Sequence, residues 1–346
     1  MFSERLKLAR KRSGLSLRAL SSAMDGIVSA QAIGKYERAE MMPSSTVAIA
    51  LADALEVSLS YLLSPTTVSL ESVEFRKLAS TRARERAAVE GEVLDHVDRY
   101  LQIEEILGID TTQSECPSGA LHIVNSMEDA EQAATAVRAA WNLGGGPIPD
   151  MTDLLEERGI KVFKWSLPGS VDGLSCHVRR VGGADVPVVV CSTEKSLERQ
   201  RFTIVHELGH IVADVQGEKA CNRFAGAFLV PGEELMREVG RRRASFGFAE
   251  LIEIKHMFGI SAASLVMRMR DLGIISDSTL RDIFEGIGSS WKTSEPSPLS
   301  RKERPKRFRR LCLRALAENE ISESKAAELL RLRVSEIDRI MAGSAA

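Results

Sequence analysis

Apolar residues recur at three- and four-residue spacing along most of the chain, which is the pattern of amphipathic helices. Over residues 1–63 this spacing predicts several short helices, interrupted at Gly14, at Gly26 and at Pro43. Ser16 and Ser29 follow two of these breaks and are expected N-caps, because a serine hydroxyl accepts a hydrogen bond from a free amide of the first turn. A long charged helix is predicted over 70–107, followed by a loop over 108–125.

From about residue 126 the pattern alternates between helices and short β-branched runs. Helices are predicted over 127–141, 151–158, 197–212 and 218–229, with two more across 247–276 that break at 259–261. Strands are predicted over 159–163, 174–178 and 186–191. A stretch rich in Ser, Pro, Lys and Glu over 288–305 is expected to be a linker, and helical spacing returns over 306–341.

These elements predict an α+β protein that is mostly helical, with a small sheet in its central part. The expected division is an all-α domain at 1–65, a helical linker at 66–125, a mixed domain at 126–285, a second linker at 286–305 and a basic helical region at 306–346.

Composition narrows the class of protein. Hydrophobic residues at 44% and charged residues at 27% are enough for ordered cores, and a net charge of −2 excludes a wholly basic nucleic-acid coat protein. The five cysteines form no CxxC pair, which favours a reducing compartment without a disulfide framework. The N-terminus opens without an apolar signal core, and no run of about 18 apolar residues is present. A soluble, cytoplasmic protein without a membrane span is expected.

The strongest chemical signal is the HExxH motif formed by His206, Glu207 and His210. Histidines four residues apart lie on one helix face, so both imidazoles can reach one Zn²⁺. Glu207 sits beside that face, where it would act on a water molecule rather than bind the metal. The alternative is a buried helix whose histidines bond neighbouring carbonyl groups.

A hydrolytic zinc site needs a third protein ligand, and two acids downstream are candidates. Asp214 follows His210 by four residues and would serve if the helix continued. Glu218 follows a Gln-Gly turn and opens the next predicted helix, so it would face the motif from an antiparallel return helix. We favour Glu218 as the third ligand. The alternative is that Glu218 is an ordinary acid in the first turn of a helix, where the helix dipole stabilises its charge.

Residues 201–210 (RFTIVHELGH) and 218–231 (EKACNRFAGAFLVP) closely resemble the ImmA/IrrE metallopeptidase family. The resemblance extends to 141–148, 172–175 and 258–261, and so covers about 126–276. It implies a zincin-like (gluzincin) domain with a small sheet and an HExxH helix. It also implies zinc bound by His206, His210 and Glu218, with Glu207 as the general base of peptide-bond hydrolysis.

Residues 1–63 resemble the XRE class of helix-turn-helix domains, through 6–10 (LKLAR), 14–16 (GLS), 28–37 (VSAQAIGKYE) and 51–55 (LADAL). In that fold the helix opened by Ser29 enters the major groove of DNA. The resemblance implies base-facing positions at Ser29, Ala30, Gln31 and Lys35, and phosphate contacts from Arg10, Arg12 and Arg18. A helical module for dimerisation or partner docking is the alternative interpretation.

The C-terminal region is basic, with eight basic residues and one acid over 301–314. Such a cluster attracts a polyanion. Residues 321–337 look like a second small helix-turn-helix, whereas a charged helix packed on the core is an equally good interpretation.

Two hypotheses of function follow. In the first, the protein is a DNA-binding transcriptional regulator with a zinc-dependent endopeptidase domain that cleaves a repressor-type protein in stress or mobile-element control. In the second, it is a non-proteolytic regulator or antitoxin whose peptidase-like domain senses a ligand or metal. The expected partners are double-stranded DNA and a protein substrate, with a homodimer allowed.

Overall fold

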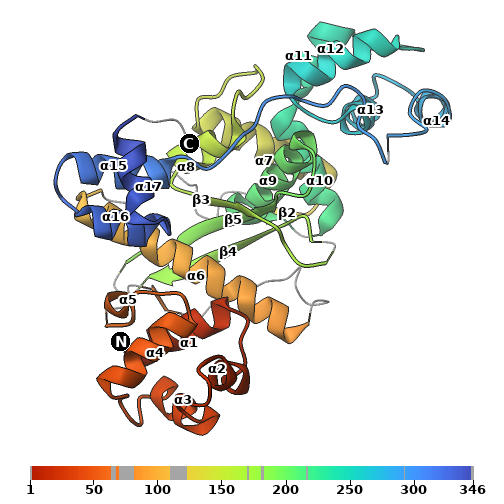
Figure 1. The fold of residues 1–346 in the computed structure, drawn as a ribbon. Helices are drawn as coiled ribbons and strands as arrows, with labels where there is room; N and C mark the ends of the chain where they lie inside the picture. The colour runs from red at the N-terminus through yellow and green to blue at the C-terminus, as the bar shows by residue number, and fades with distance from the viewer. Residues whose placement is uncertain are drawn as a thin grey trace. The chain divides into compact units, whose positions relative to one another are not determined.

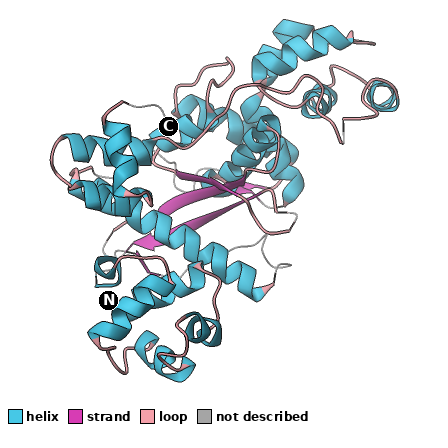
Figure 2. Cartoon of the chain, viewed as in Figure 1, coloured by secondary structure: helices cyan, strands magenta, loops and turns pink. Residues whose placement is uncertain are grey.

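A computed structural model describes residues 2–63, 68–69, 82–109, 123–169, 171–180, 183–215, 217–291 and 293–343 (Figure 1). The chain divides into two compact units. The first unit comprises 1–113, 177–186 and 306–346, and the second comprises 114–176 and 187–305. Helices dominate the described residues, as the fold class predicted (Figure 2).

The first unit begins with five short helices: α1 (Phe2–Arg12), α2 (Leu17–Ala23), α3 (Ala30–Glu37), α4 (Ser45–Ala54) and α5 (Leu59–Leu63). Serine caps the starts of α2, α3 and α4. The hydroxyls of Ser16, Ser29 and Ser44 each accept a hydrogen bond from the backbone amide three residues on, at 3.1, 3.2 and 3.4 Å. Buried apolar side chains of these helices, among them Leu6 and Ile33, form one core. The N-caps predicted at Ser16 and Ser29 are confirmed.

Helix α6 (Ala83–Ile106) packs on α1 and is buried along much of its length. The two backbones come very close at Gly91, where an added Cβ would lie 2.5 Å from the backbone nitrogen of Arg12. Only glycine fits there. The long helix was predicted over 70–107, and its segment 70–81 lies outside the described residues.

Three further helices complete the first unit: α15 (Arg307–Ala317), α16 (Glu323–Leu330) and α17 (Val334–Met341). Arg307 pairs with Glu104 of α6 at 2.6 Å. Glu328 accepts hydrogen bonds from the hydroxyls of Ser58 and Ser60 at 2.7 and 2.8 Å. The tail is therefore packed against the rest of its unit, which favours the interpretation of charged helices packed on a core.

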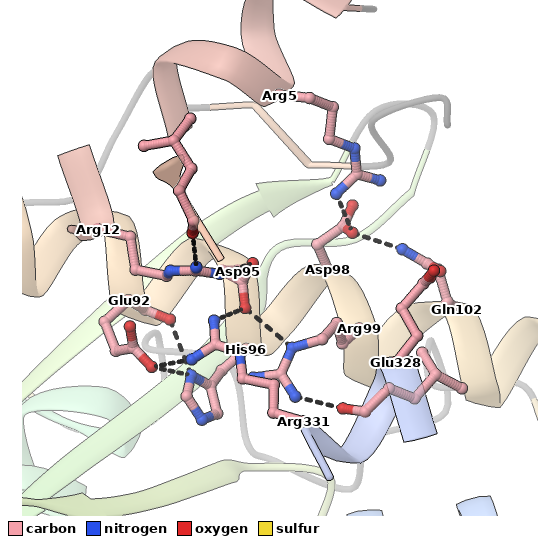
Figure 3. Close-up of polar contacts among 12 residues, drawn as sticks. Arg5, Arg12, Glu92, Asp95, His96, Asp98, Arg99, Gln102, Glu328 and Arg331 are labelled. Carbon is pink, nitrogen blue, oxygen red and sulfur yellow. Dashed lines mark hydrogen bonds and ion pairs between the residues drawn. The ribbon is translucent and has the colours of Figure 1, made fainter. Parts of the chain in front are cut away.

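A network of charged side chains centres on α6 (Figure 3). Asp95, 1% exposed, accepts from Arg12 of α1 at 3.3 Å, from Arg99 at 2.8 Å, and from Arg331 of the C-terminal region. Burial acts to raise the pKa of Asp95, but the three guanidinium charges outweigh it and hold the pKa well below its ordinary value. One carboxylate thus joins three segments that are distant in sequence.

Glu92, one turn before Asp95, makes the first unit sensitive to acid. Burial acts to raise its pKa, but the hydrogen bond with His96 and the charge of Arg331 lower it from 4.5 to about 2. A carboxyl whose folded pKa is depressed stabilises the fold above its unfolded pKa and loses that contribution as pH falls through the folded pKa. We expect the free energy of unfolding to decline between about pH 4.5 and 2. Urea titrations at stepped pH should show a weaker decline in Glu92→Gln, and equal pH dependence in both proteins would contradict this assignment.

The second unit combines helices with a small sheet. Its strands are β3 (Lys161–Trp165), β4 (Gly173–Arg180), which continues into the first unit, and β5 (Val186–Ser192). Strands β3 and β5 pair in parallel from Lys161 opposite Val188 to Trp165 opposite Ser192. The strand order is β1-β4-β5-β3, where β1 (Val68–Ser69) pairs antiparallel with the end of β4.

The helices of the second unit are α7 (Met127–Ala140), α8 (Met151–Glu157), α9 (Leu197–Val212), α10 (Glu218–Leu229), α11 (Gly232–Val239), α12 (Phe248–Phe258), α13 (Ala262–Asp271) and α14 (Asp277–Glu285). Helix α10 packs between α7 and α9, and their apolar faces form the largest core. Two short helices, α11 and α14, were not predicted.

The prediction of a loop over 108–125 is wrong at its end. Strand β2 (Ile123–Val124) pairs in parallel with β6 (Asp214–Val215). A two-residue parallel pair leaves no periodic signal in a sequence, because alternation needs at least four residues to be visible. Within the described residues, no helix is long and apolar enough to cross a membrane.

Candidate metal centre and DNA-binding face

Helix α9 carries the HExxH motif and has the bounds predicted from the sequence. The hydroxyl of Ser196 caps it by accepting from the amide of Arg199 at 3.3 Å. Val205 and Leu208 are fully buried in the core of the second unit, whereas Phe202 is only partly buried. His206 and His210 therefore lie one turn apart, with their ring centroids 5.3 Å from each other.

His206 is held by a residue of the next helix. Its Nδ1 donates to the side-chain oxygen of Asn222 at 2.9 Å, because an amide oxygen can only accept. The proton on Nδ1 leaves the lone pair on Nε2, the atom that a metal would bind. Nε2 lies 3.3 Å from a carboxylate oxygen of Glu218. The geometry thus places Glu218 at the metal-binding side of the first histidine.

Glu207 follows the first histidine of the motif and is 1% exposed. Its carboxylate accepts a hydrogen bond from the hydroxyl of Ser175 on β4 at 2.8 Å. Burial and the negative charge of Glu207 raise the pKa of the nearby Cys176 thiol to about 12, so this cysteine stays protonated. The hydroxyl of Ser175 therefore fixes the position of the Glu207 carboxylate.

Helix α10 returns along α9 and brings two more donors to the site. Gly209 allows this approach, because an added Cβ would lie 3.1 Å from the ring of Phe224. The sulfur of Cys221 lies 3.4 Å from Nε2 of His210. His206, His210 and Cys221 have donor atoms within 4.8 Å of one another, a group that could hold a metal ion.

Two buried ion pairs fix the N-terminal half of α9. Arg201 pairs with Glu303, and both side chains are almost fully buried. Glu303 also accepts from the backbone amide of Met151 at 3.0 Å. Lys255 of α12 pairs with Glu198 at 2.8 Å, with both side chains 0% exposed. The predicted linker over 288–305 therefore lies against the helix that carries the candidate metal centre.

Helix α3 presents the candidate DNA-reading positions in the first unit. Gln31 and Lys35 are exposed on it, and Ala30 is half-buried at its start. The hydroxyl of Ser29, an exposed residue, is the N-cap of this helix. Arg18 on α2 is also exposed. These side chains are accessible to a ligand outside the unit.

Arg10 and Arg12, the other phosphate-contact candidates, make contacts within their own unit. Arg10 bonds Glu37 of α3 through two nitrogens at 2.5 and 2.7 Å. Arg12 pairs with Asp95 and donates to the carbonyl oxygen of Leu55 at 3.0 Å. Their guanidinium groups stabilise the packing of α1, and Arg18 is the more accessible cation.

Two family models match separate parts of the chain. Residues 6–62 match the model described as Helix-turn-helix. Residues 155–270 match Peptidase_M78, described as the IrrE N-terminal-like domain. The chain joins a helix-turn-helix domain to an IrrE-like domain. Both resemblances predicted from the sequence are confirmed, and a comparison with curated proteins finds no match.

The IrrE-like domain carries a donor set that suits a metal ion. Two imidazoles, a thiol and a carboxylate converge from α9 and α10, and zinc accepts all three donor types. Asp214, the other candidate for third ligand, follows the end of α9 in β6, and its side chain lies outside the described part of the protein. Helix α9 ends at Val212, so Asp214 is not on its helical continuation.

Sequence reasoning gave no site role to Ser175, Cys221 or Asn222. Cys221 is buried like a small core residue, but its sulfur lies beside His210. The spacing of Glu218, Cys221 and Asn222, three and four residues apart, is the available signal. Such residues share one helix face.

Removing the hydrogen bond to His206 should weaken metal binding. We expect Asn222→Ala to lower zinc affinity by about 10–100-fold, since partners that orient a ligating histidine contribute that much. Competition with a chromogenic chelator measures this affinity. The matched control is Lys219→Ala, an exposed neighbour on α10, which should bind zinc like the wild type. Unchanged affinity in Asn222→Ala would refute the orienting role.

Proposed function

We propose that the protein is a DNA-bound zinc endopeptidase that cleaves a repressor-type protein in stress or mobile-element control. One observation carries the proposal. Glu207 follows the first of the paired histidines, its carboxylate accepts a hydrogen bond from Ser175, and it is not part of the group of donor atoms formed by His206, His210 and Cys221. A carboxylate in that position serves hydrolysis, whereas a purely structural metal site does not need one.

The residues divide the chemistry between them. Bound zinc would supply a Lewis acid that polarises the scissile carbonyl group and activates water. Glu207 takes a proton from the attacking water and passes it to the nitrogen of the leaving amine. Ser175 fixes the carboxylate, and Asn222 fixes the ring of His206. His206, His210 and a residue of α10 would hold the metal.

A cleft beside the centre offers room for a substrate chain. It has a volume of about 640 Å³ and is lined by residues that include Phe202, Asn222 and Met267. Asn222 is therefore shared between the cleft and the candidate metal centre. Its lining mixes apolar side chains with charged ones, among them Lys219, Arg268 and Asp271, and could contact both side chains and backbone groups of a peptide.

The helix-turn-helix domain would place this activity on DNA. Gln31 and Lys35 are exposed on α3, the helix that enters the major groove in this fold.

We expect Gln31→Ala to relax sequence preference, with a cost of about 1–3 kcal/mol in the free energy of binding to the preferred site. Arg18→Ala should weaken binding to all sequences alike and reduce the salt slope by about one.

Fluorescence anisotropy with DNA from upstream of the protein's own operon measures both effects. The charge-matched control is Arg242→Ala, an exposed residue of the IrrE-like domain, which should leave the salt slope unchanged. Salt-independent binding, or no binding, would favour a docking role for residues 1–63.

Metal content together with hydrolysis tests the proposal as a whole. The wild type should bind one zinc ion per chain and cleave protein, and the His206→Ala/His210→Ala double variant should do neither. Retained cleavage in the double variant would rule out the metallopeptidase assignment.

The alternative is a regulator that senses metal and cleaves nothing. The observation in its favour is the number of donors, since Glu218 and Cys221 both lie at the histidines and a hydrolytic site needs only one of them. Under this alternative, Glu207→Gln would leave regulation intact.

A further inference from the structure

Cys221 lies against the second histidine of the candidate centre. Its sulfur is 3.5 Å from Nδ1 and 3.4 Å from Nε2 of His210. The residue is 0% exposed, and its sulfur shares one small volume with the donor atoms of both histidines. Glu218, three residues earlier on α10, lies at the other histidine, 3.3 Å from Nε2 of His206.

The Glu218–His206 separation matches an edge of a zinc coordination tetrahedron. Zinc binds thiolate sulfur at about 2.3 Å and imidazole nitrogen or carboxylate oxygen at about 2.0–2.2 Å. Two tetrahedral ligands then stand about 3.5 Å apart for sulfur and nitrogen, and about 3.3 Å apart for nitrogen and oxygen. The Glu218–His206 separation has the second of these values. The sulfur of Cys221 lies within reach of either nitrogen of His210, at 3.5 and 3.4 Å, so the ring of His210 would turn to direct one lone pair at a metal shared with the sulfur.

The two helices supply the donors in pairs. His206 and His210 are four residues apart on α9, and Glu218 and Cys221 are three residues apart on α10, so each pair occupies one helix face. The helices pack directly on each other. Two facing pairs provide four protein ligands, which is the number found in closed zinc sites.

Exposure distinguishes the two donors of α10. Cys221 is completely buried, whereas the side chain of Glu218 is 67% exposed. A buried thiolate has no route to solvent without movement of α10. An exposed carboxylate can rotate away and leave a coordination position open, as a catalytic zinc requires.

We propose that Cys221 is the permanent third protein ligand of the metal and that Glu218 is an exchangeable fourth. Metal binding would displace the thiol proton to solvent as the sulfur–metal bond forms. With Glu218 bound the centre is closed and latent, and with Glu218 released it is open to water and substrate. This inference rests on the metal site of the proposed function and adds a means of regulating it.

Cobalt(II) in place of zinc is the direct probe, because thiolate ligation gives an intense sulfur-to-cobalt band in the near ultraviolet. The full-length wild type loaded with cobalt should show this band. Cys221→Ser should lose this band and bind cobalt more than about 100-fold less tightly. A residue that only hydrogen-bonds to a metal ligand changes affinity by about 10–100-fold, so the larger loss identifies a direct ligand. Glu218→Gln should keep the band with a smaller loss of affinity. Cys191→Ser, which changes another buried thiol of the same domain, should behave like the wild type.

The wild-type spectrum tests the proposal even if a variant fails to fold. Cobalt bound without the band would overturn the role of Cys221. If Glu207-dependent hydrolysis persists in that case, the peptidase proposal stands with Glu218 as third ligand. A wild type that binds neither cobalt nor zinc would overturn both proposals.

Discussion

Glu207→Gln is expected to abolish nearly all peptide hydrolysis while leaving the bound metal in place. General base catalysis contributes about 10²–10⁴ in rate, and an amide cannot accept a proton from water. The substitution keeps the shape of the side chain and can still accept the hydrogen bond from Ser175. The metal-binding atoms of His206 and His210 are untouched. Initial rates on a protein substrate, with metal content measured on the same preparation, test this expectation.

The control for this experiment is Glu233→Gln, an exposed acid in the first turn of α11. It loses the same charge and should hydrolyse like the wild type. DNA affinity should be equal in all three proteins, because the helix-turn-helix domain lies in the other unit. A Glu207→Gln variant that retains more than about a tenth of the wild-type rate would exclude Glu207 as the general base.

Asp95→Asn is expected to destabilise the first unit by about 3–5 kcal/mol, the usual cost of leaving a buried ion pair without one partner. The carboxylate is 1% exposed and forms ion pairs with Arg12, Arg99 and Arg331 (Figure 3). Replacing it leaves three guanidinium groups without their shared anion. Because Arg331 belongs to the C-terminal region, limited proteolysis should also cut 306–343 sooner in the variant.

Asp53→Asn is the matched control for this substitution, because Asp53 is an exposed acid of α4 in the same unit. It should change the free energy of unfolding by less than about 0.5 kcal/mol, as most surface substitutions do. Equal urea midpoints for Asp95→Asn and Asp53→Asn would show that the network contributes little to stability.

Local signals were sufficient to predict the helices that carry the candidate site. Helices α9 and α10 have the bounds expected from periodicity, since a serine cap precedes one and Gly217, with a positive φ, precedes the other. The same reasoning located α12 and α13, because Gly259 takes a left-handed conformation that ends a helix. The HExxH motif of the metallopeptidase resemblance lies within α9, whereas the helix-turn-helix resemblance rested on residues of α1 to α4 and the breaks between them.

Contacts between distant segments could not be predicted from one sequence. Glu303 bonds Arg201 across 102 residues, and Asp95 joins segments from both ends of the chain. No spacing rule connects such positions, because side-chain pairing over that range depends on the completed fold. Cys221 illustrates the same limit. Its burial was predictable, whereas its approach to His210 depends on how closely α10 packs on α9 at Gly209.

The most direct test of the endopeptidase activity is a comparison of new protein N-termini in cells that carry either the wild type or Glu207→Gln. Mass spectrometry of labelled N-termini, after induction of each protein to the same level, gives the measurement. The account predicts a new N-terminus within a DNA-binding repressor that arises in the wild type and is absent from the variant. Identical sets of N-termini in the two strains, with normal metal content in both proteins, would contradict it.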